Sequence, residues 1–262
     1  MFDRSATLSS EELKFYDNNG YLIVDNIFSL EECEQAIFVF ERHARLSDNT
    51  EFKAVMNLDR PEEWSHIYKP HERWAHQYVR QMLLKHPAIV TILETIQRTE
   101  PGGVVLMQSM FLYKKASTDY NTQAWLPHQD GIYHGSPLGG TLTANIIFTD
   151  QDKENGCMFV YPGSHKIGCF LEAKQTTSFH EKFGQKPGND VTDSLPEEFK
   201  GKEIELHLKQ GSILVLHGGV IHGSYPNISP DRDRPMFLAP YKTEGVPFSV
   251  GLNGDRKEIP IR

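Results

Sequence analysis

A histidine and an aspartate two residues apart, His128 and Asp130, are well suited to hold a metal ion. In an extended strand, positions i and i+2 project from the same face, so both side chains can reach one ion without distorting the backbone. His222 lies far downstream, where a neighbouring strand can bring it to the same ion. Two histidines and one carboxylate form the facial set of non-haem Fe(II) oxygenases, which leaves coordination positions open.

His217 competes with His222 for the third ligand position. It follows the apolar run Ile213–Leu216. A histidine that ends such a strand is more often a packed, hydrogen-bonded core residue than a ligand. We therefore predict that His222 is the ligand.

Arg234 is a candidate for binding a carboxylate, because it precedes the predicted strand Pro235–Tyr241. A guanidinium binds a carboxylate with two hydrogen bonds, as a dicarboxylate cosubstrate held by iron at its other end requires. Arg232 lies two residues earlier, with the same strand parity. Spacing alone does not separate the two arginines.

The elements that must position these residues change character near Gly102 and Gly103. Before them, capping boxes at Ser9 and Ser29 predict two helices around a short strand, and two more helices are expected near 72–84 and 87–97. After them, short runs of β-forming residues are separated by Gly, Pro, Asn and Asp, which predicts short antiparallel strands. These strands are expected at Val104–Lys114, Thr141–Thr149, Met158–Tyr161, Glu203–Leu208, Ile213–Leu216 and Pro235–Tyr241.

This pattern predicts a mainly β fold with flanking α-helices. We expect one domain over residues 1–262, with an N-terminal helical region at about 9–98 and a β core at about 103–250. The irregular stretches 46–70 and 165–200 are predicted to border the pocket and to close over a substrate.

Composition narrows the class of partner. Hydrophobic residues make up 39% of the chain and charged residues 24%, as in globular proteins, and the net charge is −8. The basic surface of a nucleic-acid or anionic-membrane binder is therefore not expected. No leader or membrane-spanning pattern is evident, so we expect a cytoplasmic protein that binds a small-molecule substrate. The sequence does not indicate an oligomeric state.

Several motifs in order carry a resemblance to a known family. They are the HQD triplet at 128–130, the run 152–158 leading to Tyr161-Pro162-Gly163-Ser164-His165, and His222-Gly223-Ser224 with Asn227 before Arg234. Together they resemble the phytanoyl-CoA dioxygenase family, and the resemblance covers roughly residues 9–242.

The resemblance implies a double-stranded β-helix, or jelly-roll, that uses Fe(II), 2-oxoglutarate and O2. It implies that the metal ligands are His128, Asp130 and His222. It assigns Arg234 to the distal carboxylate of 2-oxoglutarate, and further cosubstrate contacts to Ser224, Met110, Asn145 and Lys114. Family members often carry Trp where this chain has Asn145.

One wall of the pocket and the type of reaction can also be predicted. Alternate residues Gln108, Met110, Leu112 and Lys114 are expected to share one strand face, with Gln108 and Trp125 in the substrate pocket. Related halogenases carry a small residue at the position of Asp130, so hydroxylation is the expected outcome, with desaturation and ring-forming oxidation as alternatives. Two other classes are weighed: a cupin-like isomerase or hydrolase with the same ligands, and a non-catalytic jelly-roll binding module.

Overall fold

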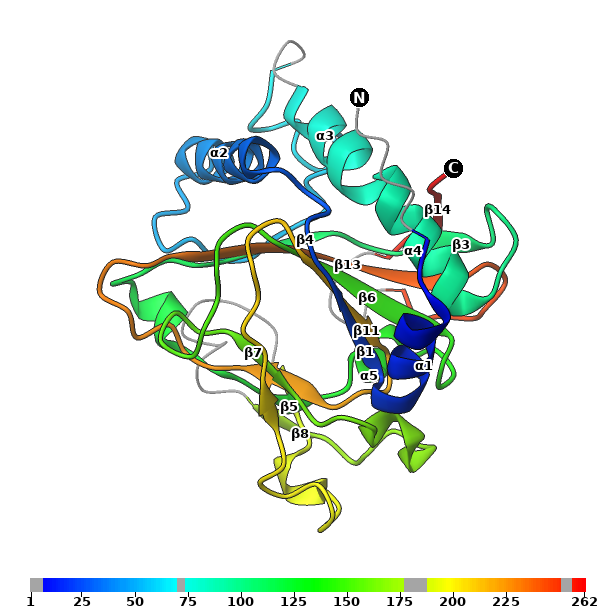
Figure 1. Ribbon diagram of the computed structural model, residues 1–262. Helices are drawn as coiled ribbons and strands as arrows, with labels where there is room; N and C mark the ends of the chain where they lie inside the picture. Colours follow the sequence, from blue (N-terminus) through cyan, green and yellow to red (C-terminus); the bar gives the residue numbers. More distant parts are fainter. Residues whose placement is uncertain (1–6, 70–73, 177–187, 251–255) are drawn as a thin grey trace.

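Two antiparallel sheets face each other in the computed structural model, which describes residues 7–69, 74–176, 188–250 and 256–262 (Figure 1). Within these ranges the large sheet has eight strands, in the order β1-β11-β6-β13-β3-β14, with β4 on β13 and β2 on β4. The small sheet has the order β10-β7-β12-β5, and β8 and β9 form a separate pair. Two facing antiparallel sheets are the arrangement of a jelly-roll, so the predicted fold class is confirmed.

The strands of the large sheet are β1 (Tyr21–Val24), β2 (Val55–Met56), β3 (Val104–Leu106), β4 (Met110–Lys114), β6 (Thr141–Ile147), β11 (Ile213–His217), β13 (Arg234–Thr243) and β14 (Ile259–Pro260). The others are β5 (Trp125–His128), β7 (Met158–Val160), β8 (Lys174–Thr176), β9 (Gly188–Asp190), β10 (Ile204–Glu205) and β12 (His222–Ser224).

Helices α2 (Leu30–Leu46), α3 (Trp74–Tyr78) and α4 (Pro87–Gln97) lie on the side of the large sheet away from the small one (Figure 1). Both predicted capping boxes are present, at α1 (Ser10–Asn19) and at α2. Apolar residues of α2 and α4 pack with the large sheet in the main hydrophobic core. The face of this sheet toward the small sheet is therefore left for the cavity.

Three sequence predictions of secondary structure are corrected. The expected strand 104–114 is two strands, β3 and β4, which both pair with β13 and are separated by residues 107–109. The expected helix 72–84 is α3 followed by a π-helical segment, Val79–Leu84. Within 165–200, where little strand was expected, β8 and β9 pair as antiparallel strands. Residues 70–73 and 177–187 of these stretches lie outside the described residues.

Among the described residues, no helix has the length and apolar character needed to cross a membrane.

Candidate metal centre and cosubstrate pocket

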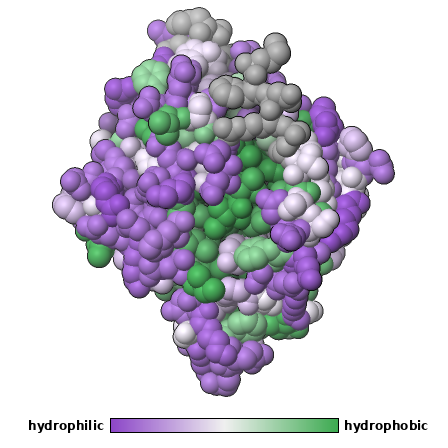
Figure 2. Space-filling model, in the orientation of Figure 1, coloured by the Kyte–Doolittle hydropathy of each residue, from purple (hydrophilic) through white to green (hydrophobic). Residues whose placement is uncertain are grey.

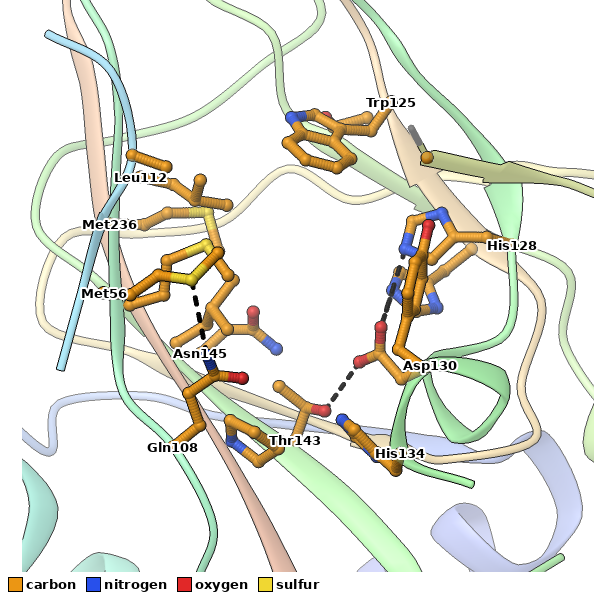
Figure 3. Close-up of a pocket in the computed structure, with 18 of the residues that line it drawn as sticks. Met56, Gln108, Leu112, Trp125, His128, Asp130, His134, Thr143, Asn145 and Met236 are labelled. Carbon is orange, nitrogen blue, oxygen red and sulfur yellow. Dashed lines mark hydrogen bonds and ion pairs between the residues drawn. The ribbon is translucent and has the colours of Figure 1, made fainter. Parts of the chain in front are cut away.

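A cavity of about 570 Å³ lies between the two sheets. Strands β4, β6 and β13 line it on one side, and β5 and β12 on the other. Figure 2 shows apolar side chains gathered at the centre of one face of the molecule, between hydrophilic borders. Figure 3 shows Met56, Leu112 and Met236 across the cavity from His128 and Asp130. An apolar pocket with a few convergent polar groups is typical of a small-molecule site.

His128, Asp130 and His222 lie together at this cavity. One potential ligand atom from each lies within 4.8 Å of the others. Asp130 Oδ1 is 3.6 Å from the Nε2 atom of each histidine. His128 and His222 are directly opposite in the register of β5 and β12, which explains why residues so far apart in sequence meet.

The two imidazole rings are held in the tautomer that a metal requires. His128 Nδ1 is 2.7 Å from the backbone oxygen of Leu126, and His222 Nδ1 is 3.1 Å from that of Val220. A carbonyl oxygen can only accept, so each neutral ring carries its proton on Nδ1. Both Nε2 lone pairs are thereby directed toward Asp130 and are available for a metal.

Asp130 is oriented by a hydrogen bond on its other oxygen. Thr143 Oγ1 donates to Asp130 Oδ2 at 2.6 Å, as Figure 3 shows. Burial acts to raise the pKa of Asp130, but the neighbouring histidines, His222 first, outweigh it and hold the pKa below its usual value. Burial also lowers the pKa of His222 to about 4. Asp130 is thus a carboxylate and His222 a neutral imidazole near neutral pH, which is the protonation state of metal ligands.

The strand argument for His128 and Asp130 was wrong in one respect. Only His128 is on a strand, because β5 ends there and Asp130 begins the short helix α5 (Asp130–His134). The turn depends on close approach at Gly131, whose N–H donates to Gly218 O at 2.7 Å. A Cβ on Gly131 would lie 2.5 Å from the Phe170 ring.

Gln129 joins this turn to the segment that carries His222. Its side chain is fully buried, donates to Gly219 O at 2.8 Å and accepts from the N–H of Leu171 at 2.8 Å. The residue between the two predicted ligands therefore fixes the distance between both ligand-bearing segments.

Arg234 lines the same cavity and is 1% exposed. Its Nη2 donates to Ser224 Oγ at 3.5 Å, its Nη1 lies against the sulfur of Met236, and its Nε has no partner. Burial lowers the pKa of Arg234 to about 10, so the guanidinium is still charged at neutral pH. No carboxylate among the described residues forms an ion pair with it. A buried cation without an anionic partner indicates a site for an anion.

Lys114 lies next to this arginine but not at the cavity surface. Its Nζ donates to Ser224 Oγ at 2.9 Å, to Gln123 O at 3.2 Å and to Tyr225 O. Burial, followed by the charge of Arg234, lowers the pKa of Lys114 well below its usual value. Of the four residues expected to share one wall, Gln108, Met110 and Leu112 line the cavity, whereas Lys114 lies outside its lining.

Arg232 and His217, the alternatives to Arg234 and His222, interact with residues outside the cavity. Arg232 precedes β13 and pairs with Asp152 at 2.7 Å and with Glu154 at 2.7 Å. His217 Nδ1 accepts the N–H of Gly219 at 3.0 Å, so its neutral ring carries the proton on Nε2, opposite to His222. Neither residue lines the cavity.

The remaining predicted residues all border the cavity. Asn145 does so from β6 while its Nδ2 donates to Leu214 O at 3.1 Å. Gln108 donates to Met56 Sδ at 3.3 Å, and Trp125 lies on the side of His128 (Figure 3). The stretch 46–70 contributes Met56 and Trp64, so its described part borders the pocket as predicted.

Thr143 and Arg256 are among the cavity-lining residues that were not anticipated from the sequence. Thr143 is the partner of Asp130, and the alternation of polar residues in Thr141-Leu142-Thr143-Ala144-Asn145 was a usable signal for a polar strand face. Arg256 also lines the cavity, but it lies beyond the expected β core and belongs to no motif.

Comparison with known proteins agrees with this geometry. The family profile described as phytanoyl-CoA dioxygenase (PhyH) matches residues 16–236. "Phytanoyl-CoA dioxygenase 1" of Oryza sativa subsp. japonica is 23% identical, with 98% of this chain and 96% of the relative covered.

Solved structures with the same fold include two enzymes of nogalamycin biosynthesis. The non-heme alpha ketoglutarate dependent carbocyclase SnoK is 20% identical, with a TM-score of 0.69 over 100% of this chain and 98% of that one. The epimerase SnoN, in complex with Fe3+, alpha ketoglutarate and nogalamycin RO, is 18% identical, with a TM-score of 0.64 over 91% and 84%.

The residues present fit the cofactors of that family. The His-Asp-His set has the donor atoms that suit iron, and the guanidinium without an anionic partner suits a dicarboxylate in the same cavity. With the family match, this identifies Fe(II), 2-oxoglutarate and O2 as the cofactors.

Proposed function

The chain belongs to the phytanoyl-CoA dioxygenase family and is an Fe(II)- and 2-oxoglutarate-dependent oxygenase, and on this premise we propose that it hydroxylates a C–H bond of a small molecule. The substrate class is a metabolite or natural-product intermediate, and succinate and CO2 are released. The observation that carries the proposal is that the metal-binding set and a buried guanidinium share one apolar cavity.

In this proposal His128, Asp130 and His222 hold the iron. Their second hydrogen bonds, to Leu126, Thr143 and Val220, keep the ligand atoms in place before the metal arrives. Bound iron and 2-oxoglutarate supply the oxidising chemistry with O2. The protein contributes placement of the reactants and exclusion of water.

Arg234 binds the distal carboxylate of 2-oxoglutarate. Ser224 positions the guanidinium from β12, and Lys114 donates to the same hydroxyl. Met110, Asn145, Gln108 and Trp125 all line the same cavity. In this proposal Met110 and Asn145 contact the cosubstrate, and Gln108 and Trp125 contact the substrate. The cation is already desolvated, so a carboxylate there forms a strong charge-assisted pair.

Asp130 supports hydroxylation over halogenation, because its carboxylate occupies the position that a halide needs on the metal. Cyclisation and epimerisation, the activities named for SnoK and SnoN, use the same fold. A hydroxylated product is heavier than the substrate by one oxygen and a cyclised product is lighter by two hydrogens, whereas an epimer has the same mass and must be identified by its stereochemistry.

The test is incubation with Fe(II), ascorbate, O2 and 2-oxoglutarate in a metabolite extract. We expect a product heavier by one oxygen and an equivalent amount of succinate. Omission of 2-oxoglutarate and the His222→Ala variant are the controls, and both should abolish the product. A product that gains no oxygen and is lighter than the substrate by two hydrogens would identify desaturation or ring closure instead. Turnover under anaerobic conditions without 2-oxoglutarate would favour the cupin-like isomerase or hydrolase.

A further inference from the structure

Arg256 is a second buried guanidinium at the cavity. It is 3% exposed, and its Nε and Nη1 are buried with no hydrogen-bond partner. No ion pair joins it to a carboxylate among the described residues. A buried charge without a partner is costly, so a ligand that completes the pair is the simplest account of its retention.

The two carboxylates that line the cavity, Glu63 and Asp130, already have other partners. Glu63 contacts Arg60 Nη1 at 3.0 Å and accepts from Asn57 Nδ2 at 3.2 Å. Asp130 faces the two histidines with one oxygen and Thr143 with the other. Neither is within ion-pair distance of Arg256.

The formal charges around the cavity leave Arg256 unbalanced. Two positive charges on iron and one on Arg234 balance Asp130 and the two carboxylates of 2-oxoglutarate. Arg60 balances Glu63. One further anionic group would therefore balance these charges within the cavity.

The backbone around Arg256 is fixed by contacts of its own segment. The N–H of Lys257 donates to Met107 O at 3.1 Å, and Glu258 pairs with the fully buried Lys242. Strand β14 then pairs with β3. A guanidinium carried on such a segment is preorganised for one position of its ligand.

We propose that Arg256 binds a carboxylate of the substrate, which makes the substrate an acid with an apolar body. The apolar part of the cavity lining suits such a body, and includes Met56, Trp64, Leu112 and Leu238. This rests on the proposed function and specifies the substrate class of the same site. The acid group is distinct from both carboxylates of 2-oxoglutarate.

The test measures binding rather than turnover. The anaerobic complex with Fe(II) and 2-oxoglutarate is titrated calorimetrically with straight-chain carboxylates from butyrate to decanoate and with their primary amides. We expect at least one acid to bind about tenfold or more tightly than its amide, because the amide lacks the charge. The Arg256→Gln variant should lose this preference, and Arg256→Lys should keep part of it. Arg262→Gln, on the same segment but paired with Glu94 outside the cavity lining, is the matched control.

Affinity for 2-oxoglutarate separates the two arginines. Arg256→Gln should change the Kd of 2-oxoglutarate less than about twofold, whereas Arg234→Gln should raise it strongly. Equal losses in both variants would assign Arg256 to the cosubstrate and overturn the proposal. Equal binding of acids and amides, or no binding of any acid to the wild-type complex, would also overturn it. Consumption of 2-oxoglutarate tests the oxygenase function separately, because it needs no recognition of an acid.

Discussion

The two walls of the cavity differ in how far the protein itself satisfies their polar groups. On the metal wall, defined as His128, Asp130 and His222, every proposed ligand side chain has a hydrogen bond to the protein through its other polar atom. On the arginine wall, defined as Arg234 with Met236, the guanidinium has a hydroxyl at 3.5 Å, a thioether and an unpartnered Nε. The side chains of the metal wall are therefore already oriented before a metal binds. The guanidinium of the arginine wall gains its missing partner only when an anionic ligand binds.

Because of this difference, substitutions on the two walls are expected to affect different properties of the protein. A preorganised metal site loses affinity mainly when a ligand or its supporting hydrogen bond is removed. An unpaired buried cation costs the free protein stability, and its removal costs ligand affinity. The following predictions test each wall in turn.

Loss of one metal ligand should have the largest effect. We expect His128→Ala, Asp130→Ala and His222→Ala each to abolish stoichiometric iron binding, because two remaining ligands hold iron poorly. Iron content after anaerobic reconstitution measures this. His217→Ala is the matched control and should keep its iron. If His217→Ala lost iron while His222→Ala retained it, the ligand set would be wrong.

Arg234→Gln should raise the Kd of 2-oxoglutarate by the equivalent of about 2–5 kcal/mol, since a buried charge-assisted contact is lost. Equilibrium dialysis of labelled 2-oxoglutarate under anaerobic conditions measures it. Arg232→Gln is the control, because Arg232 pairs with Asp152 and Glu154 away from the cavity lining and should leave the Kd nearly unchanged. Similar losses in both variants would contradict the assignment of Arg234.

Thr143→Val should weaken iron binding by about 10–100-fold while leaving all three ligands in place. The reason is that Asp130 loses the donor to its Oδ2 and is less firmly oriented. Competition with a chelator of known affinity gives the iron Kd. Thr141→Val, on the same strand face but bonded to His134, should have a smaller effect. An unchanged iron Kd in Thr143→Val would show that the metal wall does not depend on this support.

The smallest expected effect concerns pH and His217. Burial lowers the pKa of His217 to about 4 from the usual value of 6.5. A histidine with a depressed pKa stabilises the fold fully above about pH 6.5, and that contribution is lost as the pH falls toward 4. Chemical unfolding of the metal-free protein should therefore show a shallower loss of stability in this window for His217→Asn than for wild type. An identical slope would mean that His217 is not buried in its neutral form.

Local motifs explain which parts could be predicted. The capping boxes at Ser9 and Ser29 act within one helical turn, and both are formed. His128 and Asp130 are close in sequence, so their meeting needs little tertiary information, although the turn between them depends on Gly131 approaching Gly218. That approach is a long-range contact, which accounts for the error in assigning both residues to a strand.

Long-range pairing explains what could not be predicted. The break at residues 107–109 and the approach of Arg256 depend on how β3 and β14 pair, and no local spacing encodes that pairing. Lys114 has the strand parity of Met110, but its side chain ends against Ser224 and Tyr225, outside the cavity lining. The alternation of residues along a strand predicts which face of the sheet a side chain lies on. It does not predict whether the end of a long side chain reaches the cavity.

The direct opposition of His128 and His222 in β5 and β12 also bears on folding fidelity. A one-residue slip of β12 would turn the next residue, Gly223, toward the metal wall and move His222 to the other face. Gly223 has no side chain to coordinate iron. Only the native alignment of these two strands can then load the metal. Iron uptake during refolding is therefore a direct assay of strand alignment, independent of any substrate.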